Sequence, residues 1–325
     1  MKSELYTIET KEDLDLEICQ IFYDLHGYRL INHDVITDHG CPSERIDRAT
    51  AIMMIDFVMR QAMKVNIKDL SKSDLKTTID KMQQAIGSHK SSTPLLYNKR
   101  ILSAYLKSPI NPVELFRAAR GVEDLPLMPV TAESAIIAQK GWYFLLGYAA
   151  LTRWRSHKRL APAGTSELDD AIGYFRQDLE NRSGRWETWY RLAQTYDSKL
   201  EEDITWSAEK INNNRTELAT LQRNAIHCYA MALAMASRTA EPTPETRVTL
   251  SELFTDFGTR IYSSTREPLS MGAFSLANFP RHYSNEESQQ MYKGEPFKEM
   301  RLYSAWNFAS HLLKRAIVDK PKNWM

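Results

Sequence analysis

The chain has 325 residues, of which 43% are hydrophobic and 26% are charged, and its formal net charge is +1. This composition is that of a globular chain long enough to bury a large core. The near-neutral charge excludes a global basic field that would attract nucleic acid and a global acidic field that would attract basic proteins.

Several simple classes are also excluded by composition. The chain contains no run of about 18 apolar residues, so a transmembrane helix is not expected. Its three cysteines form no CxxC pair, which favours a reducing compartment. Glycine is scarce, and Val- and Thr-rich alternating runs are missing, which predicts an all-α fold.

Residues 1–130 are expected to form an irregular helical region without a repeat signature. Gly27 and Gly87 are predicted to end two of its helices, and Pro42 with Ser43 is predicted to open another. Helical periodicity runs over 11–31, with the helix ending at Gly27, and further helices are predicted from 43 onward and over 68–86, 95–106 and 112–120, with a turn over 121–129.

Residues 131–325 are expected to form TPR-like helical repeats, as one continuous irregular α-solenoid of hairpins. A long helix is predicted over 133–156, and the next helix is predicted to follow Ser166. Trp189, Leu192, Ala193 and Tyr196 then match the W-x2-L-G-x2-Y signature of a first TPR helix, with Ala in the Gly position.

The partner helix of this unit lies further along the chain than a standard repeat allows. Ala225, Tyr229 and Ala232 match the second-helix pattern, so an insert is predicted at about 200–224. Its periodicity predicts one long helix over about 205–238, which the run Asn212–Asn214 could break because asparagine is a poor helix former.

The C-terminal part contains a second insert and a last helix. Residues 267–298 are rich in Pro, Ser, Asn and Gly and predict an insert of low order. Ala309, Leu313, Ala316 and Pro321 match the end of a second TPR helix. A solenoid normally ends in a polar capping helix, and none follows, so the chain is expected to be a fragment of a longer protein.

The concave face of a TPR-like array would bind a protein partner. By position in the repeat, we expect this face to include Phe144 and Tyr148 on one unit, and Glu187, Tyr190, Gln194 and Asp197 on the next. Packing of Phe144 and Tyr148 against the next hairpin is an equally open alternative. If the groove is used, replacing Tyr190 should weaken partner binding and leave folding mostly intact.

An acidic run of Glu201, Glu202 and Asp203 is a candidate contact for a basic partner such as a histone tail. Such runs also occur as helix caps or solvated surface. No nucleotide-binding, metalloprotease or hydrolase motif is present, and no catalytic site, cofactor or small-molecule substrate is predicted.

Two further possibilities stay open. His26, His33, His39 and Cys41 supply zinc-type ligands, but their spacing matches no common metal motif. The basic residues around Trp154 could contact nucleic acid, or could simply end a helix, where cations are favourable. Nucleic-acid binding is therefore a weak alternative.

The stretch from WETWYRLAQTYDSKLEED through the Asn-containing insert to RNAIHCYAMALA resembles the large scaffold subunit of the HIR histone-chaperone complex of fungi, whose metazoan counterpart is Cabin. The N-terminal DLDLEICQIFYDLHG and DHGCPSERIDRATA are similar to the middle region of that family. The insert makes the resemblance specific, since the TPR signature alone is widely shared.

The resemblance implies a nuclear, non-enzymatic scaffold that binds WD-repeat HIR subunits. It implies a role in replication-independent nucleosome assembly and in histone-gene repression, within chromatin and transcription regulation. The alternatives are a direct histone-binding module that uses the acidic run, or a generic TPR adaptor in another complex.

Overall fold

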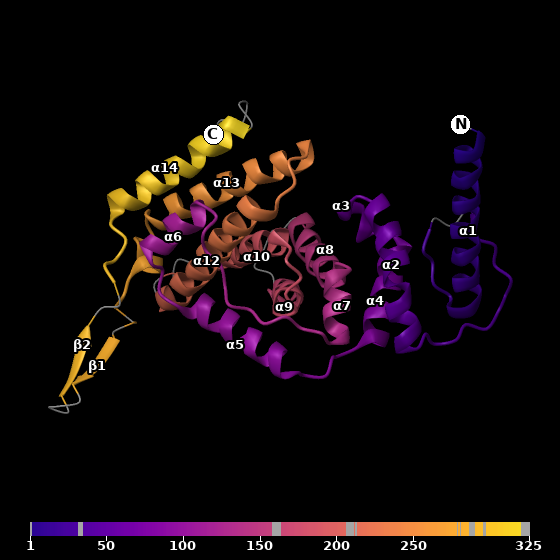
Figure 1. Ribbon diagram of the computed structural model, residues 1–325, viewed down its shortest axis with the longest axis horizontal. Coiled ribbons are helices and arrows are strands. Elements are labelled where there is room, and N and C mark those ends of the chain that lie inside the picture. The colour runs from indigo at the N-terminus through magenta and orange to yellow at the C-terminus, as the bar shows by residue number, and fades with distance from the viewer. Residues whose placement is uncertain are drawn as a thin grey trace. The chain divides into compact units, whose positions relative to one another are not determined.

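The structure is a computed structural model that describes residues 2–31, 35–157, 164–205, 211, 213–277, 279, 281–285, 290–294 and 297–319. Within these ranges the elements are helices apart from one small β-hairpin, which confirms the predicted all-α fold (Figure 1). None of the described helices is both long and apolar enough to cross a membrane.

The chain divides into two compact units. The first combines residues 1–91 with 131–157, and the second combines 92–130 with 158–325. These units do not follow the expected division at residue 130, because the segment 131–157 packs with the N-terminal residues. One continuous solenoid over 131–325 stays a prediction.

The first unit consists of six helices in the described ranges: α1 (Lys2–His26), α2 (Arg48–Lys64), α3 (Ile67–Leu70), α4 (Asp74–Ile86), α7 (Glu133–Gln139) and α8 (Trp142–Ser156). Gly27 and Gly87 end α1 and α4, as predicted, and both have positive φ. The expected start of α2 at Pro42 and Ser43 was wrong. The carboxylate of Asp47 accepts a hydrogen bond from the backbone N–H of Thr50 at 3.0 Å, so the helix begins at Arg48.

The predicted long helix over 133–156 is also wrong, because the chain forms α7 and α8 with a break between them. Gly141 adopts φ of +86°, a left-handed conformation that ends helical pairing. The following Trp142 is fully buried, and its indole N–H donates to Gln83 Oε1 at 2.7 Å. The break therefore turns α8 so that its first residue packs against α4.

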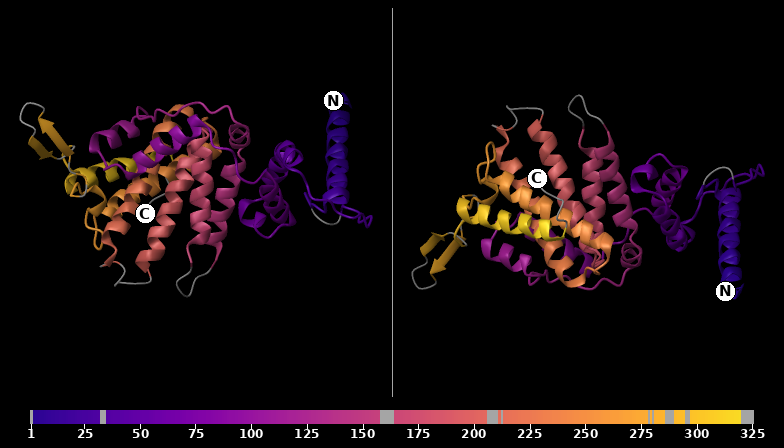
Figure 2. Two further views of the ribbon diagram at one scale, coloured as in Figure 1. Left: turned by 90° about the horizontal axis from the view of Figure 1, so that it is seen from below. Right: turned by 90° about the horizontal axis from the view of Figure 1, so that it is seen from above.

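The elements of the second unit are α5 (Thr93–Lys107), α6 (Pro112–Ala119), α9 (Ser166–Glu180), α10 (Trp186–Thr205), α12 (Arg215–Thr239), α13 (Pro244–Ser264), the 3-10 helix η2 (Gly272–Phe274), β1 (Arg281–Asn285), β2 (Gln290–Gly294) and α14 (Leu302–Asp319). In this unit, α9, α10, α12, α13 and α14 stack successively, whereas α5 and α6 pack on α12. Helix α10 packs on α9 and α12, and α13 packs on α12 and α14 (Figures 1 and 2). Successive packing of α9 to α14 is the arrangement expected of a helical solenoid or bundle.

The signature residues form the core of this stack. Trp189, Leu192 and Ala193 of α10 are 1%, 0% and 0% exposed. The rings of Tyr229 and Phe257 stack with centroids 5.6 Å apart, and the Phe257 ring meets Phe308 edge-on at the same separation. Aromatic contacts therefore run from α12 through α13 to α14.

A glycine allows α13 and α14 to approach closely. A Cβ atom at position 258 would lie 2.8 Å from Leu313 Cγ and 3.3 Å from the carbonyl oxygen of Ala309. Only glycine fits there without displacing α14.

The expected helix over about 205–238 is corrected by the structure. Helix α10 extends to Thr205, and α12 begins at Arg215, directly after Asn214 at its N-cap position. Helical continuity is thus interrupted at Asn214, within the asparagine run that the alternative named. Residues 206–210 and 212 lie outside the described residues.

The expected low order of residues 267–298 is also only partly right. Their described part contains η2, whose Ala273 and Phe274 are 1% exposed, and the antiparallel strands β1 and β2. The guanidinium of buried Arg223 donates to the carbonyl oxygen of Ala273 at 3.3 Å, which attaches this segment to α12. Ala273 and Phe274 of the insert are thus part of the core.

We expect Phe257→Ala to lower the free energy of unfolding by about 3–5 kcal/mol, because it removes a ring that is 0% exposed and contacts two other aromatic rings. Tyr262→Ala on the same helix is the control, since Tyr262 is 46% exposed and its loss should cost less than about 1 kcal/mol. Urea denaturation followed by circular dichroism measures both. Equal effects would contradict the packing described here.

The free energy of unfolding should also fall as the pH is lowered, because His227 is buried on α12. Its Nε2 lies 3.0 Å from the carbonyl oxygen of Ser108, and burial lowers its pKa from 6.5 to about 4. Between these pH values the unfolded chain binds a proton that the folded chain excludes, so stability present at pH 7 is lost as pH falls from about 6.5 to about 4. The loss amounts to at most about 3 kcal/mol.

Comparison with His227→Gln isolates this effect from buried carboxylates, whose raised pKa values act in the opposite direction. The amide of glutamine keeps a donor for Ser108 but does not titrate. The wild-type protein should lose more stability than the variant over that pH interval, as measured by thermal unfolding. Parallel pH profiles would refute the role of His227.

Candidate functional site

The predicted partner-binding residues occupy different environments. Phe144 and Tyr148 lie half-buried on α8 in the first unit, with ring centroids 5.8 Å apart. The other seven residues lie on α10 in the second unit. A single groove that contains both sets stays a prediction.

Three of the predicted groove residues lie in the interior of the second unit. Tyr190 is 0% exposed, and its hydroxyl donates to Asp256 Oδ2 at 2.9 Å. The side-chain amide of Gln194 donates to the same oxygen, also at 2.9 Å. The face of α10 that was expected to form a groove is therefore covered by α13. The burial of Tyr190 speaks against the expectation that it can be replaced with folding mostly intact, which stays a prediction.

Asp197 is the centre of a second interior contact. The Tyr229 hydroxyl of α12 donates to its Oδ2 at 2.7 Å, and Nε of Arg260 on α13 lies 2.6 Å from its Oδ1. Burial raises the pKa of the Asp197 carboxyl, and the Arg260 guanidinium opposes that rise. We name Asp197, Tyr229 and Arg260 the interhelical triad, because one side chain comes from each of three helices.

The remaining predicted residues are nearer the surface. Glu187 is half-buried, and burial raises its pKa. In the acidic run, Glu202 is 8% exposed and Asp203 is half-buried, whereas the side chain of Glu201 is 72% exposed. A Glu201 carboxylate oxygen lies 3.9 Å from Arg260. The run is thus not one continuous acidic surface, and Glu201 is its most accessible member.

The proposed zinc ligands do not come together among the described residues. There, no group of three His, Cys, Asp or Glu side chains is arranged to hold a metal ion. His39 Nδ1 pairs with the Asp24 carboxylate at 3.0 Å, and His26 Nδ1 lies 3.0 Å from the carbonyl oxygen of Glu44. Cys41 is exposed, and His33 lies outside the described residues.

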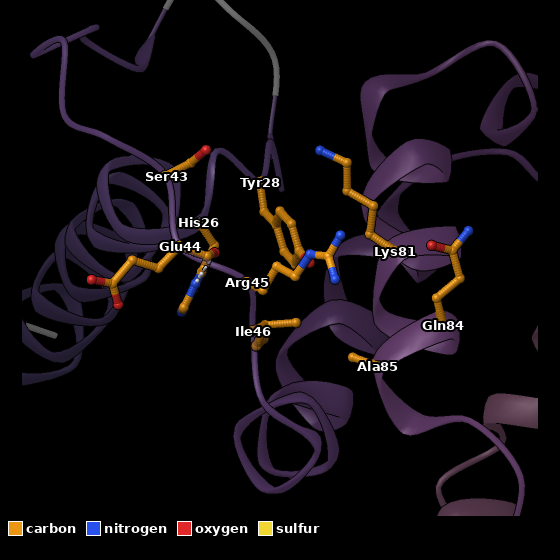
Figure 3. Close-up of a pocket in the computed structure, with 9 residues that line it drawn as sticks. All are labelled: His26, Tyr28, Ser43, Glu44, Arg45, Ile46, Lys81, Gln84 and Ala85. Atoms are coloured by element: carbon orange, nitrogen blue, oxygen red, sulfur yellow. Dashed lines mark hydrogen bonds between the residues drawn. The ribbon is translucent and has the colours of Figure 1, made fainter.

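The structure also contains a pocket in the first unit that the sequence did not predict. It has a volume of about 450 Å³ and lies between the end of α1, the loop before α2, and α4 (Figure 3). Its lining residues are His26, Tyr28, Ser43, Glu44, Arg45, Ile46, Lys81, Gln84 and Ala85. These residues come from three separate segments without a shared motif. In the sequence, only the polar residues at positions 43–45 could have indicated a site here.

Comparisons with known proteins give a consistent result. A sequence model described as the HIR3 helical bundle domain matches residues 65–320. The protein named Histone transcription regulator 3 homolog of Aspergillus fumigatus is 70% identical over 326 residues, which cover 100% of this chain and 16% of that protein. Its Candida albicans counterpart is 27% identical over 277 residues, 82% of this chain and 17% of that protein. The chain therefore spans only 16–17% of the length of these relatives.

We expect Asp197→Ala to lower the free energy of unfolding by about 3–5 kcal/mol, because it leaves the Arg260 guanidinium largely buried without its closest carboxylate. Glu201→Ala is the control, since that side chain is 72% exposed and its removal should change stability by less than about 0.5 kcal/mol. Guanidinium denaturation measures both values. A cost for Asp197→Ala as small as that of the control would show that the interhelical triad contributes little.

Proposed function

We propose that this chain, which belongs to the HIR3 helical bundle family, is a non-enzymatic scaffold module of a HIR-type histone-chaperone complex. The observation that carries the proposal is the 70% identity, along the whole chain, with a protein named as a histone transcription regulator. This relationship agrees with the family resemblance found in the sequence. The module would act in the nucleus, in histone-gene repression and replication-independent nucleosome assembly.

The helical stack supports such a role in physical terms. Long helices held by a continuous core keep their outer faces in fixed positions, which suits a protein that positions other subunits. The expected partners are WD-repeat HIR subunits. Of the predicted contact residues, Phe144, Tyr148 and Glu187 are half-buried and remain candidates for this partner surface, whereas exposed Glu201 and half-buried Asp203 are candidates for histone contact.

A direct histone-binding module is the second candidate, favoured by the exposed carboxylate of Glu201 beside Asp203. Histones are basic, and attraction through exposed carboxylates would be screened by salt. Because the net charge is nearly zero, such attraction would have to be local.

We expect the immobilised chain to enrich WD-repeat HIR subunits from a fungal nuclear extract, with identification by mass spectrometry. Under the scaffold proposal, the double variant Glu201→Gln and Asp203→Asn captures these subunits as well as the wild-type chain does. Under the histone alternative, the same variant loses binding to purified histones, and that binding falls steeply with added salt.

The matched control is Glu245→Gln with Glu252→Gln, which removes two exposed carboxylates from α13. Equal losses of histone binding in both double variants would indicate unspecific charge attraction. Recovery of neither WD-repeat subunits nor histones would contradict both candidate functions.

A further inference from the structure

The pocket of the first unit has walls that the chain holds in place. The Thr78 hydroxyl of α4 donates to the carbonyl oxygen of Arg29 at 3.0 Å, and the Glu44 backbone N–H donates to that of Leu25 at 2.7 Å. Tyr28 and Ile46 are each 6% exposed. The segment after α1, the loop before α2, and α4 are thereby joined around a defined cavity.

Two cations face this cavity. The Lys81 ammonium lies 5.2 Å from the centroid of the Tyr28 ring. Figure 3 shows Arg45 extending from the loop, and Lys81 from α4, toward the side of the pocket where Tyr28 lies. Both cationic side chains are exposed. The carboxylate of Glu44 points away from them in the same view.

Neither cation has a carboxylate within ion-pair distance among the residues that the structure describes. Other cations of this region are paired: Arg29 lies 3.4 Å from Asp74, and Lys76 lies 2.5 Å from Asp80. Two like charges that share a concave surface create a local positive potential, which an anion would relieve. A guanidinium and an ammonium beside hydroxyl donors are the groups that bind carboxylate or phosphoryl oxygens.

We propose that this pocket binds an acidic segment of a protein partner, by inserting one anionic side chain, a carboxylate or a phosphoryl group, between Arg45 and Lys81. The volume of about 450 Å³ suits one or two side chains. Tyr28 would form the floor, with the apolar side of Ile46 beside it. This site goes beyond the scaffold function and does not depend on it.

A nucleic-acid duplex fits the surroundings less well. Its phosphates need a continuous series of cations along the backbone, whereas here Asp74 and Asp80 already neutralise the neighbouring Arg29 and Lys76. The positive potential is thus confined to one concave position, which favours a single anionic side chain.

The test measures fluorescence anisotropy of short labelled peptides on the full chain. One peptide carries central glutamates, a second carries phosphoserine at the same positions, and a third carries glutamine. We expect the first or second peptide to bind, and the double variant Arg45→Gln with Lys81→Gln to weaken that binding by about 10-fold or more, because two charge-assisted contacts are lost. The relative affinity of the first two peptides identifies the anionic group.

The matched control is Lys107→Gln with Arg120→Gln, which removes one exposed lysine and one exposed arginine from the second unit. It should change the affinity by less than about 2-fold, because neither side chain lines the pocket and exposed charges outside a site are largely screened by salt. Both double variants should fold like the wild-type chain, because the four replaced side chains are exposed. Circular dichroism melting checks this.

Several results would overturn the proposal. These are equal peptide binding by the wild-type chain and the Arg45/Lys81 variant, an equal loss in the control variant, or binding of the glutamine peptide as strong as that of the anionic peptides. Tighter binding of a DNA duplex with the same dependence on Arg45 and Lys81 would assign the site to nucleic acid instead. Inorganic phosphate that binds as tightly as either peptide would indicate a small-anion site.

Discussion

The stability of the second unit depends on the buried carboxylate of Asp197, which the packed helices shield from water and must therefore pair. Asp197 of α10 contacts the Tyr229 hydroxyl of α12 and the Arg260 guanidinium of α13. A buried carboxylate without partners costs several kcal/mol, so the three helices are stable together only in a register that brings these groups into contact. Apolar packing drives the association, and the interhelical triad selects one alignment among those that apolar contact alone would allow.

Other polar groups act in the same way at helix ends. The fully buried side chain of Asp178 accepts hydrogen bonds at 2.6 Å from the hydroxyls of Ser183 and Thr188, which joins the end of α9 to the start of α10. Asn98 of α5 donates to the carbonyl oxygens of Met128 and Glu180, both at 2.9 Å. Loops that would otherwise leave backbone groups unsatisfied are thus attached to the stack.

This internal use of polar residues bears on how the chain can recognise other molecules. Tyr190, Gln194 and Asp197 hold helices together, so they are not free to contact a partner. Glu201 is exposed, and the pocket with Arg45 and Lys81 is concave, so these positions suit the proposed contacts. In a chain of nearly zero net charge, charge complementarity has to come from such local features.

The sequence alone determined the helical class, the ends of α1 and α4 at glycines, the buried stripe of Trp189, Leu192 and Ala193, and the family, because periodicity, turn residues and motif spacing are local properties. Only the tertiary structure decided that Gly141 breaks a helix, that α13 covers the face of Tyr190, and that Arg45 and Lys81 share a pocket. Periodicity shows which residues share a face of a helix. What packs on that face depends on residues distant in the chain, whose approach is set by the whole core.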